Sequence, residues 1–298
     1  MPKNFSYIFI FCLLIAPFQL RAQDEILIQK IQEIAKTAKG KVSVATAVIE
    51  DSTHFSFYGD ELCVMQSVFK FPIALAILDR IDKHEFSLQH KIHITPKEMI
   101  KDTWSPMRDS FPNGNVNITF ENLLKYMVAE SDNIACDVLL HHLGKPKVVQ
   151  KYINKKGIED FYMKYNEAGM HKKWKNQYRN VCSPNAMVQL LTDFYKGKII
   201  SDINTKFLYD VMVSTWTGKN RIVKLLPPNT EVAHKTGSSG KNNSNMYSAV
   251  NDAGIITLPN GKHLAIAIFV NDAYADFEIL EETIAKIAKA IYDTYSKQ

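Results

Sequence analysis

The segment Met65–Pro72 carries a serine and a lysine at a spacing that could activate a nucleophile. Ser67 precedes Lys70 by three residues, and residues three apart on a helix lie on one face with Cβ atoms about 5–6 Å apart. A serine hydroxyl is a weak nucleophile until a neighbouring base takes its proton. The pair could therefore start an acyl transfer. A second Ser-x-x-Lys, residues 238–241, lies in a Gly/Asn-rich stretch, and we interpret it as accidental.

Two further motifs follow in order along the chain. The triplet Ser131-Asp132-Asn133 begins 61 residues after Lys70, and Lys235-Thr236-Gly237 begins 102 residues after that triplet ends. Each motif alone consists of common residues and recurs by chance. Together and in this order, the three motifs indicate a serine acyl-transfer site.

This ordered set of motifs is similar to that of class A β-lactamases and penicillin-binding proteins. The chain resembles a class A serine β-lactamase over nearly its whole mature length. Segments 66–72, 167–171 and 234–237 look most like the branch that contains the PER and VEB extended-spectrum enzymes. The resemblance implies an α+β fold of the β-lactamase/DD-peptidase type, with an antiparallel sheet flanked by terminal helices plus an all-α domain.

The resemblance also implies catalytic roles. Ser67 would form the acyl-enzyme, and Ser131 would pass a proton to the leaving β-lactam nitrogen. Either Lys70, or Glu167 through water, would activate the nucleophile, and the sequence leaves this choice open. Glu167 lies 36 residues beyond Ser131, near the position of the class A carboxylate that activates water against the acyl-enzyme. This glutamate favours a hydrolase over a penicillin-binding protein.

The strand around the Lys-Thr-Gly motif is expected to bind substrate. Lys235, Thr236 and Ser238 would hold the substrate carboxylate, and Gly237 would let a ligand approach the backbone closely. The resemblance implies that the N–H groups of Ser67 and Ser238 form the oxyanion hole.

The triplet offers both structural and functional roles. Ser131 begins a predicted helix and could serve only as its N-cap, whereas Asp132 is interpreted as structural. In the family, the residue matching Asn133 orients Lys70 and the substrate amide.

Two side chains outside the motifs complete the expected site. Trp104 resembles an aromatic residue at the cleft mouth, and the alternative is a half-buried loop tryptophan. Arg221 matches an arginine that strengthens the carboxylate site in some branches, and the alternative is a surface charge.

The segment after Glu167 departs from the commonest class A pattern. His171 stands where most members have asparagine, although a histidine can still hydrogen-bond a water. The usual Arg–Asp ion pair of this loop would fall on Tyr165 and Asn180, which cannot form it. The sequence therefore leaves the conformation of the loop open.

Hydrophobic periodicity predicts the elements that must position these residues. Helices are expected at 25–38, 71–81, 119–129, 132–143 and 184–194, and a closing helix capped by Asp276 follows. Strands are expected at 41–50, 53–58, 231–236, 247–258 and 263–271. We expect residues 23–61 and 215–298 to form an α/β domain, residues 62–214 to form the all-α domain, and the cleft to lie at their boundary.

Residues 1–22 read as a secretory signal, with Lys3 before a short apolar stretch and Ala22 at the cleavage site. Loss of Lys3 and Arg21 would lower the formal charge from +5 to +3. We therefore expect an exported, periplasmic or secreted monomer without a membrane anchor or nucleic-acid partner. His90, His93, His141 and His142 lack a zinc-ligand spacing, so neither metal nor cofactor is expected.

Cys63, Cys136 and Cys182 would remain after export, and Cys136 falls on the apolar face of its predicted helix. An odd number leaves at least one free thiol, and sequence alone does not identify a pair.

The predicted function is hydrolysis of the β-lactam amide of penicillins and cephalosporins, including extended-spectrum cephalosporins, through an acyl-enzyme. The first rival function is that of a DD-peptidase, which releases its acyl-enzyme slowly. The second rival is a non-catalytic β-lactam or peptidoglycan sensor, whose acyl adduct is the signal.

Overall fold

The computed structural model describes residues 24–51 and 53–297. The predicted signal at residues 1–22 lies outside the described residues.

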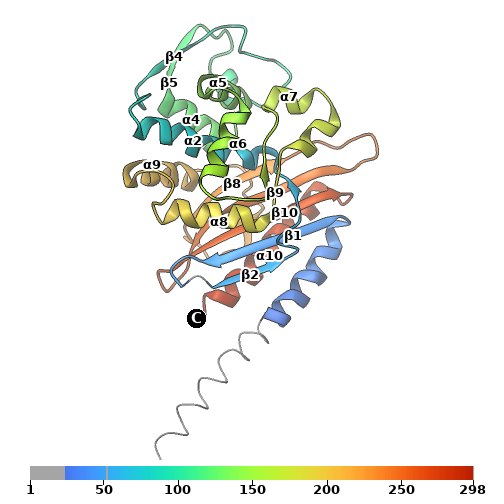
Figure 1. The fold of residues 1–298 in the computed structure, drawn as a ribbon. Helices are drawn as coiled ribbons and strands as arrows, with labels where there is room; N and C mark the ends of the chain where they lie inside the picture. The colour runs from blue at the N-terminus through green and yellow to red at the C-terminus, as the bar shows by residue number, and fades with distance from the viewer. Residues whose placement is uncertain (1–23, 52, 298) are drawn as a thin grey trace, which may run out of the picture.

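A five-stranded antiparallel sheet forms the lower half of the molecule in the view of Figure 1, with strand order β2-β1-β10-β9-β8. The strands are β1 (Lys41–Val48), β2 (His54–Phe57), β8 (Val232–Ser238), β9 (Tyr247–Thr257) and β10 (His263–Ala273). The sequence prediction of strands from both ends of the chain is confirmed. β1 is buried at all but its first residue, because helices cover both faces of the sheet.

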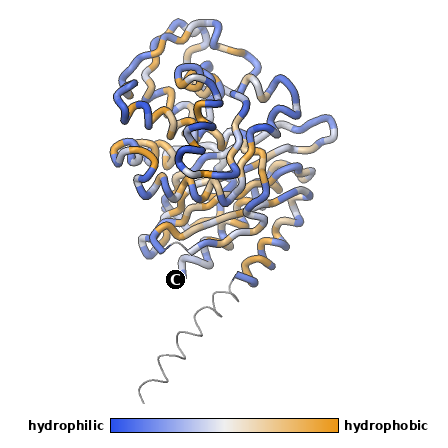
Figure 2. The backbone as a smooth tube through the Cα atoms, viewed as in Figure 1, coloured by the Kyte–Doolittle hydropathy of each residue, from blue (hydrophilic) through white to orange (hydrophobic). Residues whose placement is uncertain are grey.

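The terminal helices pack together against one face of the sheet. Residues 24–35 are helical and continue into η1 (Lys36–Ala38), and α10 (Phe277–Tyr295) closes the chain. In Figure 2 hydrophobic and hydrophilic residues alternate along the N-terminal helix, as they do in an amphipathic helix. Asp276 occupies the N-cap position of α10, but its side chain accepts no capping hydrogen bond. The helix begins where expected, but the predicted capping by the Asp276 side chain is wrong.

Helices cover the other face of the sheet and form the upper part of the molecule (Figure 1). The longer ones are α2 (Lys70–Asp82), α4 (Phe120–Ala129), α5 (Asn133–Leu143), α6 (Pro146–Lys155), α8 (Pro184–Tyr195) and α9 (Asp202–Val213). The short ones are η2 (Gln66–Phe69), α3 (Pro106–Ser110), α7 (Glu167–His171), η3 (Trp174–Arg179) and η4 (Ile222–Leu225). Two small sheets complete the fold, made of β3 (Cys63–Val64), β6 (Phe161–Tyr162) and β7 (Val181–Cys182), and of β4 (Lys91–Ile94) and β5 (Val116–Thr119).

Serine and threonine hydroxyls define where several of these helices begin. Thr119, Ser183 and Ser201 each accept a hydrogen bond from the backbone N–H three residues later. Such an N-cap satisfies a donor that the helix leaves unpaired and contributes about 1 kcal/mol. The starts of α4, α8 and α9 are thus determined by the residue that precedes each helix.

Two apolar clusters fill the interior. The larger one joins α2, α4, α5 and α8 to one face of the sheet, and the smaller one joins the terminal helices to the other face. The first nine residues of α2, from Lys70 to Leu78, are buried. Its N-terminal lysine is therefore held inside the protein. Within the described part of the chain, no helix combines the length and the apolar character that crossing a membrane requires.

Candidate active site

The nucleophile candidate lies in a tight turn ahead of a helix. Ser67 belongs to the 3-10 turn η2, directly ahead of α2, which begins at Lys70. The amide of Asn251 on β9 donates to the carbonyls of Val64 at 2.7 Å and Met65 at 3.1 Å. The central sheet thereby fixes the backbone that presents the serine.

Lys70 is the hub of the site. Its side chain is fully buried, and its Nζ lies within hydrogen-bond distance of four oxygen atoms. These are Ser131 O at 2.6 Å, Asn133 Oδ1 at 2.6 Å, Glu167 Oε1 at 2.9 Å and Ser67 Oγ at 3.1 Å. The amine is therefore positioned to exchange a proton with either the serine or the glutamate.

Glu167, in the short helix α7, also approaches the Ser67 hydroxyl. Its Oε1 lies 3.4 Å from Ser67 Oγ, and its side chain is buried. The short helix α7 carries this carboxylate, and Asn166 caps that helix by accepting from Gly169 N at 3.1 Å. A lysine and a carboxylate thus both reach Ser67, an arrangement that supplies a candidate base for each half of an acyl transfer.

Asp137 on α5 holds this carboxylate segment in place. Its two oxygens accept from Glu167 N at 2.8 Å, Ala168 N at 3.0 Å and Asn166 Nδ2 at 2.8 Å. Burial raises the pKa of the Asp137 carboxyl to about 6. No motif in the sequence singled out this residue. Its position four residues after Asn133, one turn along the same helix, was the available signal.

Within the Ser-Asp-Asn triplet, the residue that caps helix α5 is not the serine. Asp132, not Ser131, is the N-cap of α5 and accepts from Ala135 N at 2.8 Å. Its other oxygen accepts from Ser105 Oγ and Met107 N, both at 2.7 Å. The structural role expected for Asp132 is confirmed, and the N-cap alternative for Ser131 is wrong.

Ser131 instead turns its hydroxyl toward the third motif. Lys235 Nζ lies 2.9 Å from Ser131 Oγ and also donates to Thr236 O at 2.8 Å. Ser131 has a left-handed backbone, with φ at 57°, a conformation that few non-glycine residues adopt. Burial and the positive charge of Lys70 lower the pKa of Lys235 well below its usual value. Ser131 therefore lies between two lysines, bonded to one through its carbonyl and to the other through its hydroxyl.

Strand β8 is an edge strand and lines the pocket with Thr236, Gly237 and Ser238. A Cβ added at Gly237 would lie 2.5 Å from Met65 O and 3.0 Å from Ser67 N. The absence of a side chain is thus needed first for the close packing of β8 against the Ser67 turn. The structure shows a protein segment making this close approach, and the approach of a ligand to Gly237 stays a prediction.

Arg221 is buried rather than a surface charge, so that alternative is wrong. Its Nη2 donates to Ser238 Oγ at 2.6 Å, and its Nη1 donates to Asn251 O at 2.8 Å and to Gly237 O at 3.3 Å. Its Nε donates to Glu281 Oε1 on α10 at 3.1 Å. The guanidinium therefore supports the end of β8 and places positive charge beside Ser238.

Asn180 replaces the ion pair that this loop lacks. Its Oδ1 accepts from Lys164 N at 2.8 Å and from Tyr165 N at 2.9 Å, and its Nδ2 donates to Tyr165 O at 2.8 Å. Asn176 Nδ2 adds a bond to Gly169 O at 2.7 Å. The segment that carries Glu167 is thus held by side-chain amides bonded to backbone, which resolves the conformation that the sequence left open.

These residues surround a pocket of about 410 Å³. Its walls include Ser67, Asp102, Thr103, Trp104, Ser131, Asn133, His171, Thr217, Gly218, Arg221, Thr236, Gly237 and Ser238. The Trp104 side chain is 53% exposed and donates from Nε1 to Glu130 O at 2.9 Å. It lies at the rim of this pocket, which fits the cleft-mouth expectation better than a half-buried loop position.

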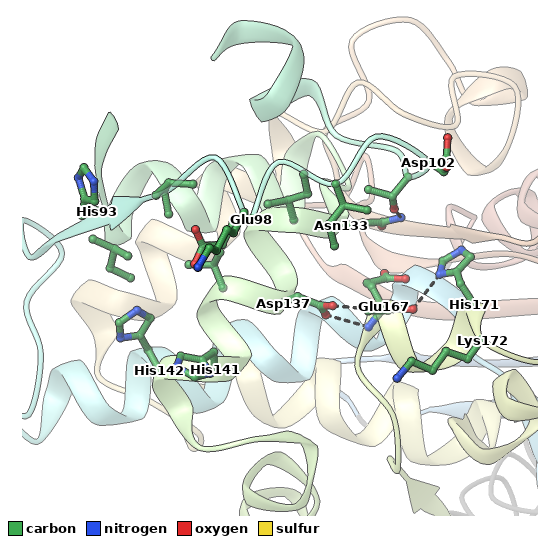
Figure 3. A pocket seen from close by; sticks show the side chains of 18 residues that line it. His93, Glu98, Asp102, Asn133, Asp137, His141, His142, Glu167, His171 and Lys172 are labelled. Atoms are coloured by element: carbon green, nitrogen blue, oxygen red, sulfur yellow. Dashed lines mark hydrogen bonds between the residues drawn. The ribbon is translucent and has the colours of Figure 1, made fainter. Parts of the chain in front are cut away.

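A second cavity of about 660 Å³ adjoins the first (Figure 3). The two share Asn133, His171, Asp102 and Thr103, and the second cavity reaches Glu167. His171 Nδ1 lies 2.8 Å from Glu167 O, a contact within α7 (Figure 3), and His171 lines both cavities.

The remaining histidines and cysteines do not form a metal site in the part of the chain that the structure describes. His93, His141 and His142 are exposed and line the far end of the second cavity. Among the residues that the structure describes, no three His, Cys, Asp or Glu side chains are grouped to hold a metal ion. Cys136 is fully buried on α5, as its apolar position predicted.

Comparison with known proteins agrees with this geometry. A family model described as the β-lactamase enzyme family matches residues 26–295. The β-lactamase VEB-1 of Pseudomonas aeruginosa is 43% identical over 276 residues, which are 92% of each chain. The extended-spectrum β-lactamase PER-1 of the same species is 34% identical over 275 residues, covering 92% of this chain and 89% of the relative. The crystal structure of the extended-spectrum β-lactamase TLA-3 superimposes with a TM-score of 0.90 at 42% identity, covering 91% of this chain and 99% of the other.

The sheet, its helical cover and the cluster of Ser67 with the buried Lys70 and Glu167 define a serine hydrolase of class A. The chain belongs to the β-lactamase enzyme family. Its similarity to the PER and VEB branch, suggested by local segments of the sequence, is confirmed over the whole matched length.

Proposed function

We propose that the protein hydrolyses the β-lactam amide of penicillins and cephalosporins through an ester on Ser67. One observation carries this proposal: Lys70 Nζ lies 3.1 Å and Glu167 Oε1 lies 3.4 Å from the same Ser67 hydroxyl. A site that only needed to form an ester would require a single base. The second group supports a site that also clears the ester with water.

Acylation begins when a base takes the Ser67 proton and the oxygen attacks the lactam carbonyl carbon. Lys70 can act directly, and Glu167 can act through a water; the geometry accommodates both. The lactam C–N bond then breaks, and the nitrogen takes a proton from Ser131, whose hydroxyl Lys235 contacts at 2.9 Å. A lysine with a lowered pKa is suited to replace that proton.

Substrate binding is assigned to the opposite wall of the pocket. The substrate carboxylate would lie near Thr236 and Ser238, with the positive charges of Lys235 and Arg221 behind them. Backbone N–H groups at Ser67 and Ser238 would bind the carbonyl oxygen as negative charge develops on it. Asn133 would orient the substrate amide, because its Oδ1 is bonded to Lys70 and its Nδ2 donates to Thr103 Oγ1 at 2.9 Å.

Deacylation is assigned to Glu167. With its segment held by Asp137, the carboxylate faces the cavity that adjoins the ester, where a water has room to bind. The carboxylate takes a proton from that water, whose oxygen attacks the ester carbon and releases Ser67. His171, which lines both cavities, offers a further hydrogen bond to this water.

The range of substrates is proposed to include bulky, extended-spectrum cephalosporins. Relatives named as extended-spectrum β-lactamases support this range. The adjoining cavity of about 660 Å³ offers space beside the catalytic pocket for a large acylamino substituent.

We further propose that residues 1–22 direct export to the periplasm or the medium, where the mature protein acts as a monomer without a membrane anchor. This location fits a lactam-destroying enzyme, because the antibiotic must be met before it reaches its target. N-terminal sequencing of the exported protein tests the proposal, and an intact Met1 would contradict it.

The decisive test of function is the number of chromogenic cephalosporin molecules opened per active site. A hydrolase continues far beyond one turnover at a constant rate. A burst of one equivalent followed by little further turnover would instead identify a DD-peptidase or a sensor that keeps its acyl group.

A further inference from the structure

Two cysteines lie directly opposite each other beside the active site. Cys63 on β3 and Cys182 on β7 are register partners in an antiparallel pair, followed by Val64 opposite Val181. Directly opposed residues point to the same face of a sheet, with Cα atoms about 4.5–5.5 Å apart. This range lies inside the Cα separation of about 4.4–6.8 Å that disulfides span.

The third cysteine is placed elsewhere. Cys136 is on α5, where the charges that act on its thiol are those of Lys70, Glu167 and neighbouring aspartates. Cys182 instead lies opposite Cys63 in the β3–β7 pair. The structure therefore selects one of the three pairings that the sequence left open.

The two thiols differ in access. Cys63 lines a cavity of about 680 Å³ between the N-terminal helix, β1 and β10, whose walls include Lys41, Glu61 and Asp272. Cys182 is fully buried behind it. Burial raises the pKa of Cys63 to about 11 and that of Cys182 well above its usual value. An oxidant would thus reach Cys63 first, before or during closure of the fold.

We propose that Cys63 and Cys182, which are free thiols in this structure, form a disulfide in the exported protein. The oxidant is a disulfide, such as that of an exported thiol–disulfide oxidoreductase. The Cys63 thiolate attacks one sulfur of the oxidant and breaks its S–S bond. The Cys182 thiolate then attacks the Cys63 sulfur of the mixed disulfide and forms the Cys63–Cys182 bond. The two cysteines lose two protons and two electrons, and the oxidant leaves as two thiols.

The bond would join the segments that carry the two halves of the chemistry. Cys63 precedes Ser67 by four residues, and Cys182 lies just beyond the segment that holds Glu167. The closed loop of about 120 residues contains both, and long loops lose the most unfolded-state freedom when they are cross-linked. We therefore expect the disulfide to stabilise the folded protein without a change in the catalytic groups.

Refolding of the reduced protein with oxidised glutathione tests the bond itself, independently of export and of catalysis. After alkylation in denaturant and tryptic digestion without reductant, peptides 42–70 and 180–196 should appear as one linked species. Cys136, in peptide 126–147, should be alkylated. Two separately alkylated peptides after oxidation, or a linked species that contains Cys136, would overturn the proposal.

Thermal unfolding supplies the second readout. Dithiothreitol should lower Tm by about 5–10 °C in the wild type and in the matched control Cys136→Ala. It should not lower Tm in Cys63→Ala or Cys182→Ala. An equal effect of dithiothreitol on all four proteins would contradict a stabilising bond between these two residues.

Discussion

Two buried ion pairs lie on either side of strand β8, and they serve different ends. Lys70 and Glu167 are 2.9 Å apart on the helical side, and Arg221 and Glu281 are 3.1 Å apart beside the C-terminal helix. All four side chains are at most 10% exposed. Burial and charge alone therefore do not distinguish the pair proposed to be catalytic, Lys70–Glu167, from the pair proposed to be structural, Arg221–Glu281.

The partners of each pair make the difference. Lys70 and Glu167 both reach the Ser67 hydroxyl, and Glu167 borders a cavity. Arg221 donates its other hydrogen bonds to the backbone oxygens of Gly237 and Asn251 and to the hydroxyl of Ser238. A buried pair performs chemistry when it shares a reactive group that faces open space, and it fixes structure when its remaining hydrogen bonds end on the backbone.

The largest expected effect comes from removing the shared hydroxyl. Ser67→Ala should abolish turnover of every β-lactam and leave the fold intact, because only that oxygen can form the ester. Intact mass spectrometry after incubation with a penicillin should show no adduct. An adduct, or undiminished turnover, would mean that the catalytic pair serves a different nucleophile.

The structural pair should respond mainly in stability. Arg221→Ala leaves Glu281 buried without its partner, which should cost about 3–5 kcal/mol of unfolding free energy, read from urea denaturation. KM should also rise, because the charge beside Ser238 is lost. The double variant Arg221→Ala/Glu281→Ala should recover part of the stability but not KM. Recovery of both would remove Arg221 from the substrate site.

A smaller effect is expected at the residue that positions Glu167. Asp137→Ala removes the acceptor of three N–H groups, and deacylation should slow by about 10-fold or more. Single-turnover measurements should show acylation changed less than deacylation. The control Asp137→Asn keeps one acceptor oxygen and should fall between the alanine variant and wild type. Equal slowing of acylation and deacylation would mean that Asp137 supports the fold as a whole and does not specifically position Glu167.

The smallest effect is expected at the rim. Trp104 is exposed and contacts Trp216 at a ring-centroid distance of 6.2 Å. Trp104→Ala should change stability by less than about 0.5 kcal/mol. Loss of an aromatic contact with the substrate, worth about 0.5–1.5 kcal/mol of binding free energy, should raise KM about 2- to 10-fold. An unchanged KM for small and bulky cephalosporins alike would exclude Trp104 from substrate binding.

The sequence predicted the Ser67–Lys70 pair better than the contacts of Asp137 and Glu281, for a physical reason. Ser67 and Lys70 are linked by local spacing, and the helices and strands that carry the three motifs follow from periodicity. Asp137 and Glu281 matter because of contacts with residues 30 and 60 positions away in the chain. Such contacts leave no local pattern in a single sequence.

Local backbone geometry was a second source of error. The sequence suggested Ser131 as an N-cap, because serine is common there, but its left-handed backbone shifts the cap to Asp132. Asp276 stands in the N-cap position of α10, yet its side chain makes no capping bond. Residue type predicted where these helices begin and not which atoms satisfy their ends.

The most direct test compares removal of the two buried glutamates. Glu167→Ala should still form the ester, helped by Lys70, but the water loses its base, so deacylation should slow by about 10²–10⁴-fold. Intact mass after mixing with a penicillin should then show one whole substrate mass retained per chain. The matched variant Glu281→Ala should lose stability and still release its acyl group at nearly the wild-type rate. Wild-type deacylation in Glu167→Ala, or a trapped ester in Glu281→Ala, would contradict the division between the two pairs.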